Sequence, residues 1–250
     1  MGTFISLAAA DGRSFEAFLE TPATPNGRGI VVLPEVYNVN QWVRGVARRY
    51  ADHGYTALVP DLFWRQAPGC HYDYDQPGPA RAQGEAVDVD AVVGDVTVAA
   101  RWLRGTLGDG ARVGVVGYCL GGRLAMLAGV RAPVDAVVSY YGVQLDRHLD
   151  ELAALRTPAL LHFGDQDPWV PNAVVSAVSA RLAGLPDVRC HVYPGAGHGF
   201  DHRSAQPPSR GRRGRVAAHA RPARRSAVAA RRSECVIQST APPCVRSIER

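Results

Sequence analysis

The sequence has 250 residues, which suits one α/β domain or a domain with a tail, and 46% of them are hydrophobic, as is usual for a globular protein. No apolar run approaches the roughly 20 residues that cross a bilayer, and we expect no secretory signal at the N-terminus. The five cysteines are odd in number and irregularly spaced, which predicts reduced thiols in a cytoplasmic protein and argues against a disulfide framework or a zinc site.

The net charge of +5 comes from one end of the chain. Residues 1–201 contain 16 arginines and 21 acidic residues, a net charge of −5, whereas residues 202–250 contain 12 arginines and 2 glutamates, a net charge of +10. We therefore predict a folded domain over residues 1–201 and an Arg/Pro/Ala-rich tail over residues 202–250. The tail has few large apolar side chains and cannot bury enough surface to order itself, so we expect it to be disordered.

Strand and helix patterns alternate along the first domain. Residues 3–20 alternate apolar and polar side chains around Asp11-Gly12, which predicts a hairpin. Short apolar runs predict further strands at residues 30–33, 55–62, 113–116, 134–141, 158–163 and 188–193. Helical spacing or helix-forming composition predicts helices at residues 42–53, 85–106, 123–128 and 172–184.

This alternation predicts an α/β fold whose mostly parallel central sheet has helices on both faces. In such sheets ligands bind at the carboxyl ends of the strands. Residues 64–84, which are rich in Gly, Pro, Tyr and Asp, form a long predicted surface excursion of the kind that often carries substrate contacts.

Residues 117–122 read Gly-Tyr-Cys-Leu-Gly-Gly and lie between a predicted strand and a predicted helix. A strand that passes into a helix this sharply strains its central residue and presents that side chain at the sheet edge, while the flanking glycines allow strand and helix to approach each other. Cys119 would therefore be a nucleophile. The alternative is a packed strand end, because free cysteine is among the most buried residue types.

Two further strand ends carry the groups that a nucleophile needs. The turn at residues 164–167 places Asp165 and Asp167 after a strand, although aspartate also favours such turns simply as an Asx or capping residue. His198 lies among glycines after the last predicted strand. The chain order nucleophile, acid, histidine is that of α/β-hydrolases, and it predicts a triad of Cys119, Asp167 and His198. The backbone N–H groups of Leu120 and Val36 would form the oxyanion hole.

Several segments together resemble the dienelactone hydrolases, α/β-hydrolases with a cysteine nucleophile, from about residue 5 to residue 200. The matching segments are Leu33-Pro34-Glu35, Asp61-Leu62-Phe63, Arg65-Gln66-Ala67-Pro68-Gly69, Gly117-Tyr118-Cys119-Leu120-Gly121-Gly122, Tyr140-Tyr141-Gly142, Gly164-Asp165-Gln166-Asp167 and Gly197-His198. The resemblance implies an α/β-hydrolase fold and hydrolysis of a small lactone or ester through an acyl-thioester, without a metal or other cofactor.

The resemblance also implies individual roles. Asp167, not Asp165, would be the triad acid, and Glu35 would accept the thiol proton when substrate binds. Glu35 has a simpler alternative as a loop carboxylate held by an arginine. Tyr37, Tyr140 and Arg81 would contact substrate.

The chain departs from the family pattern in two places. Residues 77–88, the expected lid, offer Arg81 but no tyrosine or tryptophan, and Arg203 is displaced from the arginine that follows the family's histidine. The dienelactone substrate itself is therefore open, and a related ester, lactone or thioester fits equally. We interpret residues 203–250 as the product of a shifted reading frame, which would leave an apolar strip uncovered where a last helix should dock.

A second hypothesis is an inactive hydrolase-fold binding protein whose Arg-rich tail contacts nucleic acid or acidic partners. It ranks below the hydrolase because the tail shows no aromatic interleaving and no known module. We expect a small-molecule ester or lactone as partner, no nucleic acid, no membrane, and a monomer or weak dimer.

Overall fold

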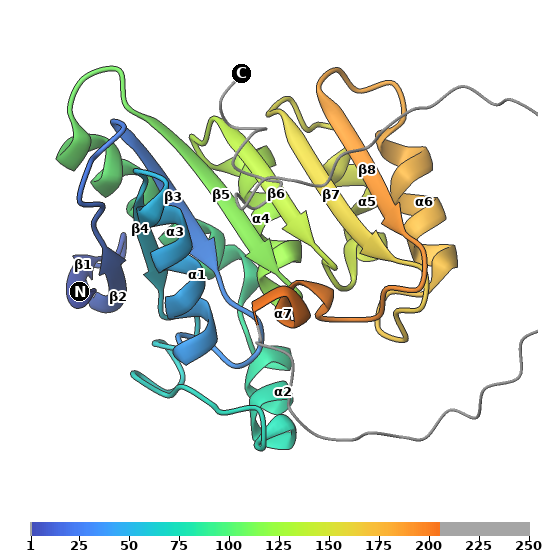
Figure 1. Ribbon diagram of the computed structural model, residues 1–250, viewed down its shortest axis with the longest axis horizontal. Helices are drawn as coiled ribbons and strands as arrows, with labels where there is room; N and C mark the ends of the chain where they lie inside the picture. The colour runs from blue at the N-terminus through green and yellow to red at the C-terminus, as the bar shows by residue number, and fades with distance from the viewer. Residues whose placement is uncertain (1, 206–250) are drawn as a thin grey trace, which may run out of the picture.

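The computed structural model of the chain describes residues 2–205 (Figure 1), so most of the predicted tail lies outside the described residues. Its strands are β1 Thr3–Ala8, β2 Ser14–Glu20, β3 Arg28–Leu33, β4 Thr56–Pro60, β5 Arg112–Tyr118, β6 Ala136–Tyr140, β7 Ala159–Gly164 and β8 Val188–Tyr193. Its helices are α1 Gln41–Asp52, α2 Pro77–Glu85, α3 Val89–Leu107, α4 Leu120–Arg131, the 3-10 helix η1 Leu145–His148, α5 Leu149–Leu152, α6 Asn172–Leu182 and α7 Phe200–Ala205.

The eight strands form one sheet in the order β1-β2-β4-β3-β5-β6-β7-β8. β1 and β2 form the predicted antiparallel hairpin, β2 pairs antiparallel with β4, and all remaining pairs are parallel. The predicted α/β fold with a mostly parallel sheet is confirmed. The carboxyl ends of β3, β5, β6 and β7 therefore meet at one edge, which Figure 1 shows near α7.

Helices cover both faces of the sheet, as the apolar strand sequences require. α3, α4 and α6 pack on one face, where Val96, Leu124 and Val178 join the larger apolar core. α1 packs on the other face through Val43 and Tyr50. The central strands are thus buried on both sides, which fixes the sheet edge at which the site lies.

A row of stacked rings crosses the sheet on the α1 face. Tyr118, Tyr140, His162 and His191 are register partners on β5, β6, β7 and β8. Their successive ring centroids lie 5.1, 4.5 and 5.5 Å apart, with nearly parallel planes. Tyr118, Tyr140 and His162 are buried, but His191 at the sheet edge is exposed.

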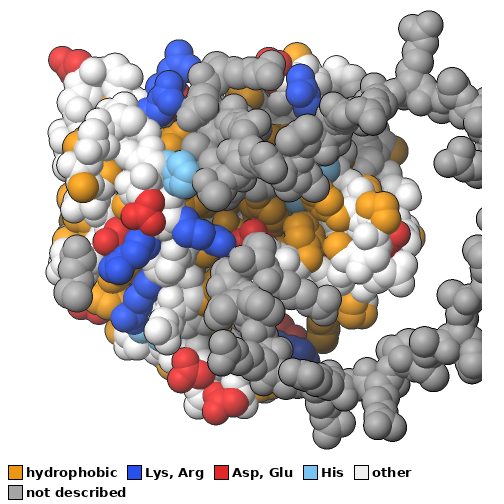
Figure 2. All heavy atoms as spheres, viewed as in Figure 1, with side chains coloured by type: hydrophobic (Ala, Val, Ile, Leu, Met, Phe, Trp, Pro, Cys, Tyr) orange, Lys and Arg blue, Asp and Glu red, His pale blue; other side chains and the backbone are white. Residues whose placement is uncertain are grey.

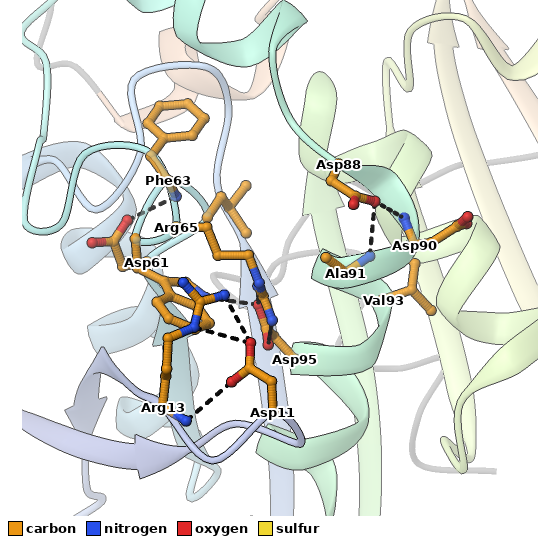
Figure 3. A network of polar contacts seen from close by, with 12 residues as sticks. Asp11, Arg13, Asp61, Phe63, Arg65, Asp88, Asp90, Ala91, Val93 and Asp95 are labelled. Atoms are coloured by element: carbon orange, nitrogen blue, oxygen red, sulfur yellow. Dashed lines mark hydrogen bonds and ion pairs between the residues drawn. The ribbon is translucent and has the colours of Figure 1, made fainter.

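The excursion after β4 is held to α3 by a polar network (Figure 3). The Arg65 guanidinium forms a two-pronged ion pair with Asp95 of α3, whose carboxylate also accepts a hydrogen bond from the Trp64 indole. Asp88 caps α3 by accepting hydrogen bonds from the backbone N–H groups of the next turn. This cap explains why α3 begins at Val89 and not at residue 85 as expected, and the excursion contains a helix of its own, α2.

Two general observations hold for the described residues. None of their helices is long and apolar enough to cross a membrane, and no group of three or more His, Cys, Asp or Glu side chains in residues 2–205 could hold a metal ion. In the face drawn in Figure 2, several basic side chains at the left lie beside acidic ones.

Candidate active site

A cavity of about 690 Å³ opens at the edge where the carboxyl ends of the parallel strands meet. Its lining comes from the loops after β3, β5, β6, β7 and β8 together with the lid helix α2. The lining includes Cys119 and His198, which the chain order had linked, and Glu35, which the family resemblance had added. A site at this position agrees with the rule that parallel sheets bind ligands at their carboxyl edge.

Cys119 lies between the end of β5 and the start of α4, in a strained backbone conformation. Its φ of 54° and ψ of −114° fall in a region that residues with a side chain rarely adopt. The backbone N–H of Cys119 donates to the Tyr140 carbonyl at 3.0 Å, which ties the turn to β6. The turn holds the thiol at the cavity wall, as predicted for a nucleophile elbow.

Glycines make this turn possible by allowing close backbone contact. A Cβ atom on Gly117 would overlap the carbonyl oxygen of Gly121, and a Cβ atom on Gly121 would overlap the carbonyl oxygen of Leu33. The Gly121 N–H donates to the Pro34 carbonyl at 3.0 Å. Helix α4 can therefore start only where both positions lack a side chain.

The histidine and the acid meet as expected. His198 Nδ1 lies 2.7 Å from Asp167 Oδ2, and the Asp167 side chain is almost fully buried. Asp167 Oδ1 accepts hydrogen bonds from the backbone N–H groups of Trp169 and Val170, at 2.8 and 3.2 Å. The carboxylate is therefore fixed in place and orients the His198 ring, whose Nε2 is left for the cavity.

The Glu35 carboxylate lies in the loop after β3 and is 5% exposed. His202 Nε2 lies 2.9 Å from its Oε1, and the Tyr74 hydroxyl donates to its Oε2 at 3.3 Å. The partners of Glu35 among the described residues are thus a histidine and a tyrosine, not the arginine of the simpler alternative. Each carboxylate oxygen of Glu35 therefore has a hydrogen-bond partner among the described residues.

Two backbone N–H groups in the cavity wall are those predicted to bind an oxyanion. Leu120 is the first residue of α4, where the N–H has no partner inside the helix, and Val36 lies in the loop after β3. Neither N–H has a backbone acceptor among residues 2–205, and both residues line the cavity beside Cys119.

The sequence model of the dienelactone hydrolase family matches residues 15–231. The chain belongs to the dienelactone hydrolase family. Carboxymethylenebutenolidase from Pseudomonas putida is 38% identical over 205 residues, covering 80% of this chain and 86% of that protein. Carboxymethylenebutenolidase 1 from Cupriavidus pinatubonensis is 31% identical over 205 residues, covering 80% and 87%. The solved structure of a candidate dienelactone hydrolase from Klebsiella pneumoniae has a TM-score of 0.71 at 26% identity and covers 83% of this chain and 92% of that one.

Family membership establishes this dienelactone hydrolase family protein as a hydrolase of carboxylic esters or lactones. The family match extends to residue 231, past residue 200 where we expected the resemblance to end. Its last part lies outside the described residues, so the predicted boundary between domain and tail stays a prediction.

Most of the predicted site residues of this dienelactone hydrolase family protein lie together, with one exception. Tyr37 and Arg81 line the cavity with the residues already described. Tyr140 does not: its ring is 3% exposed and stacks between Tyr118 and His162 in the row across the sheet. The expectation that Tyr140 contacts substrate is therefore not met, because strand register turns this side chain toward the α1 face.

The aromatic groups missing from the lid come from other segments. Trp169, in the loop after β7, lies with its ring centroid 4.4 Å from the Arg81 guanidinium carbon, and Tyr74 lies 4.4 Å from the Tyr37 ring. The wealth of tyrosine in residues 64–84 was a signal for Tyr74. Nothing local in the sequence indicated Trp169. The cavity lining also includes basic residues that the sequence did not point out, namely Arg123, Arg147 and His202.

The thiol of Cys119 is neutral in the resting site. Burial raises its pKa most, the nearby Glu35 charge raises it further, and the Leu120 N–H opposes both. No hydrogen bond joins the thiol to the His198 ring in the described part of the chain. The site therefore holds an intact histidine–aspartate pair beside a thiol that is not yet ionised.

Proposed function

We propose that this protein hydrolyses a small lactone or ester, related to the dienelactones, by covalent catalysis from Cys119. The single observation that supports this most is the convergence of Cys119, in its strained turn, with the Asp167-bound His198 in one cavity. The carboxymethylenebutenolidase relatives support a lactone or enol ester as the substrate class.

In the first half of the reaction the thiol must lose its proton. Because burial and Glu35 keep the thiol protonated at rest, substrate binding has to change its surroundings. Glu35 would accept the proton, which requires that its hydrogen bond with His202 or Tyr74 weakens. His198 holds the resulting anion in the attacking position, and its own charge is stabilised by Asp167.

The thiolate sulfur then forms a bond to the carbonyl carbon, and the carbonyl oxygen takes up negative charge. The N–H groups of Leu120 and Val36 stabilise this oxyanion. When the intermediate collapses, the C–O bond to the leaving group breaks. His198, which has by then received the thiol proton from Glu35, supplies that proton to the departing oxygen, leaving an acyl-thioester on Cys119.

In the second half, water replaces the leaving group. His198 takes a proton from the water as it attacks the thioester carbonyl, the same N–H groups stabilise the second oxyanion, and the C–S bond breaks. Protonated His198 then gives the water's proton to the sulfur, so the products are a free carboxylic acid and the Cys119 thiol. Each atom and proton is thereby accounted for, and no cofactor takes part in this scheme.

Hydrolysis of p-nitrophenyl esters by the full chain tests the assignment. We expect Cys119→Ala to lower kcat/KM about a thousandfold or more, because the nucleophile is lost. Cys190→Ala, which removes a half-buried thiol on β8, is the matched control and should retain wild-type activity. Acid-quenched mass spectrometry should find an acyl group on the peptide that contains Cys119.

Undiminished hydrolysis by Cys119→Ala would refute the nucleophile. Loss of hydrolysis without a trapped acyl-enzyme, together with a circular dichroism spectrum that differs from wild type, would show a folding effect instead. Salt-dependent binding of nucleic acid by a chain that hydrolyses no ester would favour the second hypothesis, the binding protein.

A further inference from the structure

Arg123 is a buried cation in the cavity wall that the proposed chemistry does not use. The residue is 8% exposed, although arginine is almost never buried unless it is paired. It lies in the first turn of α4, and its backbone N–H bonds to the Cys119 carbonyl at 3.3 Å. Its side chain therefore starts about one helical turn, roughly 5–6 Å, from the nucleophile.

The guanidinium of Arg123 is only partly satisfied. One terminal nitrogen donates to the Gln144 side-chain oxygen, but Nε is buried with no hydrogen-bond partner, and Arg123 forms no ion pair within residues 2–205. A guanidinium cannot lose its proton at ordinary pH, so its burial without a counter-charge is costly. Such a group needs an anion that is not part of the described chain.

A second arginine adds to the positive charge at this end of the cavity. Arg147 of η1 also lines the cavity, is exposed, and makes no side-chain ion pair with a described residue. Burial and the Arg147 charge lower the pKa of Arg123, and burial together with the nearby Arg123 charge lowers the pKa of the adjacent His148. Two like charges at one end of a cavity repel each other until an anion lies between or beside them.

We propose that Arg123 and Arg147 form an anion subsite that binds a carboxylate of the substrate about one helical turn from the reacting carbonyl. Arg123 would offer the terminal nitrogen that does not bond to Gln144 as a charged donor to that carboxylate. This subsite is separate from Arg81, which lies against Trp169 on the lid side. The inference rests on the proposed ester or lactone hydrolysis in the same cavity and narrows its substrates to those that carry an acidic group.

A matched pair of esters tests the subsite in the full chain. Mono-p-nitrophenyl glutarate carries a carboxylate at the end of its acyl chain, whereas p-nitrophenyl valerate has the same chain length and no charge. We expect Arg123→Gln and Arg147→Gln to lower the ratio of kcat/KM for the glutarate ester to that for the valerate ester by about tenfold to a hundredfold, as for loss of a charged hydrogen bond. Arg101→Gln, which removes an exposed arginine of α3 outside the cavity, should leave both rates unchanged.

Two outcomes would overturn the subsite. An unchanged ratio in both variants means that no substrate anion binds there. An equal fall for both esters, with a shifted pH profile for alkylation of Cys119, means that Arg123 acts on the thiol, since its charge favours the thiolate.

A binding measurement separates failure of the subsite from failure of the proposed function. Free glutarate should raise the melting temperature of the wild-type protein and raise it less in Arg147→Gln, an exposed position whose substitution spares the core. If the wild type hydrolyses neither ester, the proposed function fails, and the glutarate shift still decides the subsite. If glutarate leaves the melting temperature of the wild type unchanged, the subsite is refuted.

Discussion

The centre of the sheet and its β8 edge position catalytic groups by different means. At the centre, β5 leads into Cys119, and six of its seven residues are buried, so the elbow is fixed by packing and by backbone contacts. At the edge, no residue of β8 is fully buried, and the loop that follows is fixed by polar contacts. His198 bonds to Asp167, His202 bonds to Glu35, and Asp201 pairs with Arg49 of α1 at 3.0 Å.

The comparison shows that a catalytic group can be held in place either by burial in the core or by polar contacts at an exposed edge. The nucleophile side of the site tolerates almost no change of shape, because backbone atoms of β3, β5 and α4 lie in close contact around the elbow. The histidine side depends on charge and hydrogen bonding, and therefore on pH and on the residues that surround the loop.

Gly117→Ala should be the most damaging change, because it acts on the elbow at the sheet centre. The new methyl group would overlap the Gly121 carbonyl oxygen, which belongs to the backbone and cannot move aside without displacing α4. We expect loss of soluble folded protein or of all hydrolysis. Gly195→Ala, in the loop after β8 where the added atom meets no neighbour within 4 Å, is the matched edge substitution.

Gly195 has a φ of 73°, so its alanine variant is strained by about 1 kcal/mol, but its space is open. Circular dichroism and ester hydrolysis should show a folded, active protein at this position. Equal damage by both substitutions would contradict the distinction between a packed centre and a polar edge.

His162 of β7 lies between the centre of the sheet and its β8 edge, and its protonation should make the stability of the folded protein depend on pH. Burial, and to a lesser extent the adjacent His191, lowers the pKa of His162 to about 4 in the folded protein, against about 6.5 in an unfolded chain. Between these values the unfolded state binds the extra proton, so stability falls as pH drops from 6.5 to 4 and is constant again below that range. The loss from this residue amounts to about 3 kcal/mol.

Urea unfolding of the wild type and His162→Phe at pH 7 and pH 4.5 measures this contribution. The variant loses the bond between His162 and the Tyr193 hydroxyl, so it should be less stable at pH 7. It should nonetheless lose less stability than the wild type on acidification, because all other titrating groups are shared. An equal acid sensitivity of the two proteins would show that His162 is not kept neutral by the fold.

The sequence predicted the centre of the site better than its rim. The elbow, His198 and Asp167 follow strands whose apolar runs are plain, and the chain order of the three groups is a strong constraint. Tyr140, in contrast, was assigned to the pocket only by the resemblance to the family. Which face a strand residue occupies depends on register with its neighbours, and Tyr140 stacks between rings of β5 and β7 that only the paired sheet brings together.

The other residues that line the cavity could not be predicted from the sequence for a related reason. Trp169 and Arg123 are ordinary in their local sequences, and they line one cavity only because the fold brings the loop after β7 and the first turn of α4 to the same site. His202 was passed over because the family pattern directed attention to Arg203. His202 lies in the short helix α7, which brings it toward Glu35 and which was not expected from the sequence.

A pair of identical substitutions gives the smallest effects and the sharpest comparison. Val116 of β5 is fully buried, whereas Val192 of β8 is 47% exposed. Threonine has the shape of valine and a similar preference for strands, so the exchange mainly adds a hydroxyl group. At position 116 the buried hydroxyl loses its hydrogen bonds with water. We expect the free energy of unfolding, measured in urea, to fall by about 1–3 kcal/mol. At position 192 the hydroxyl stays hydrated, and the free energy of unfolding should change by no more than about 0.5 kcal/mol. A loss at Val192 as large as at Val116 would mean that the β8 edge is covered in solution, and the edge would then be held by packing as the centre is.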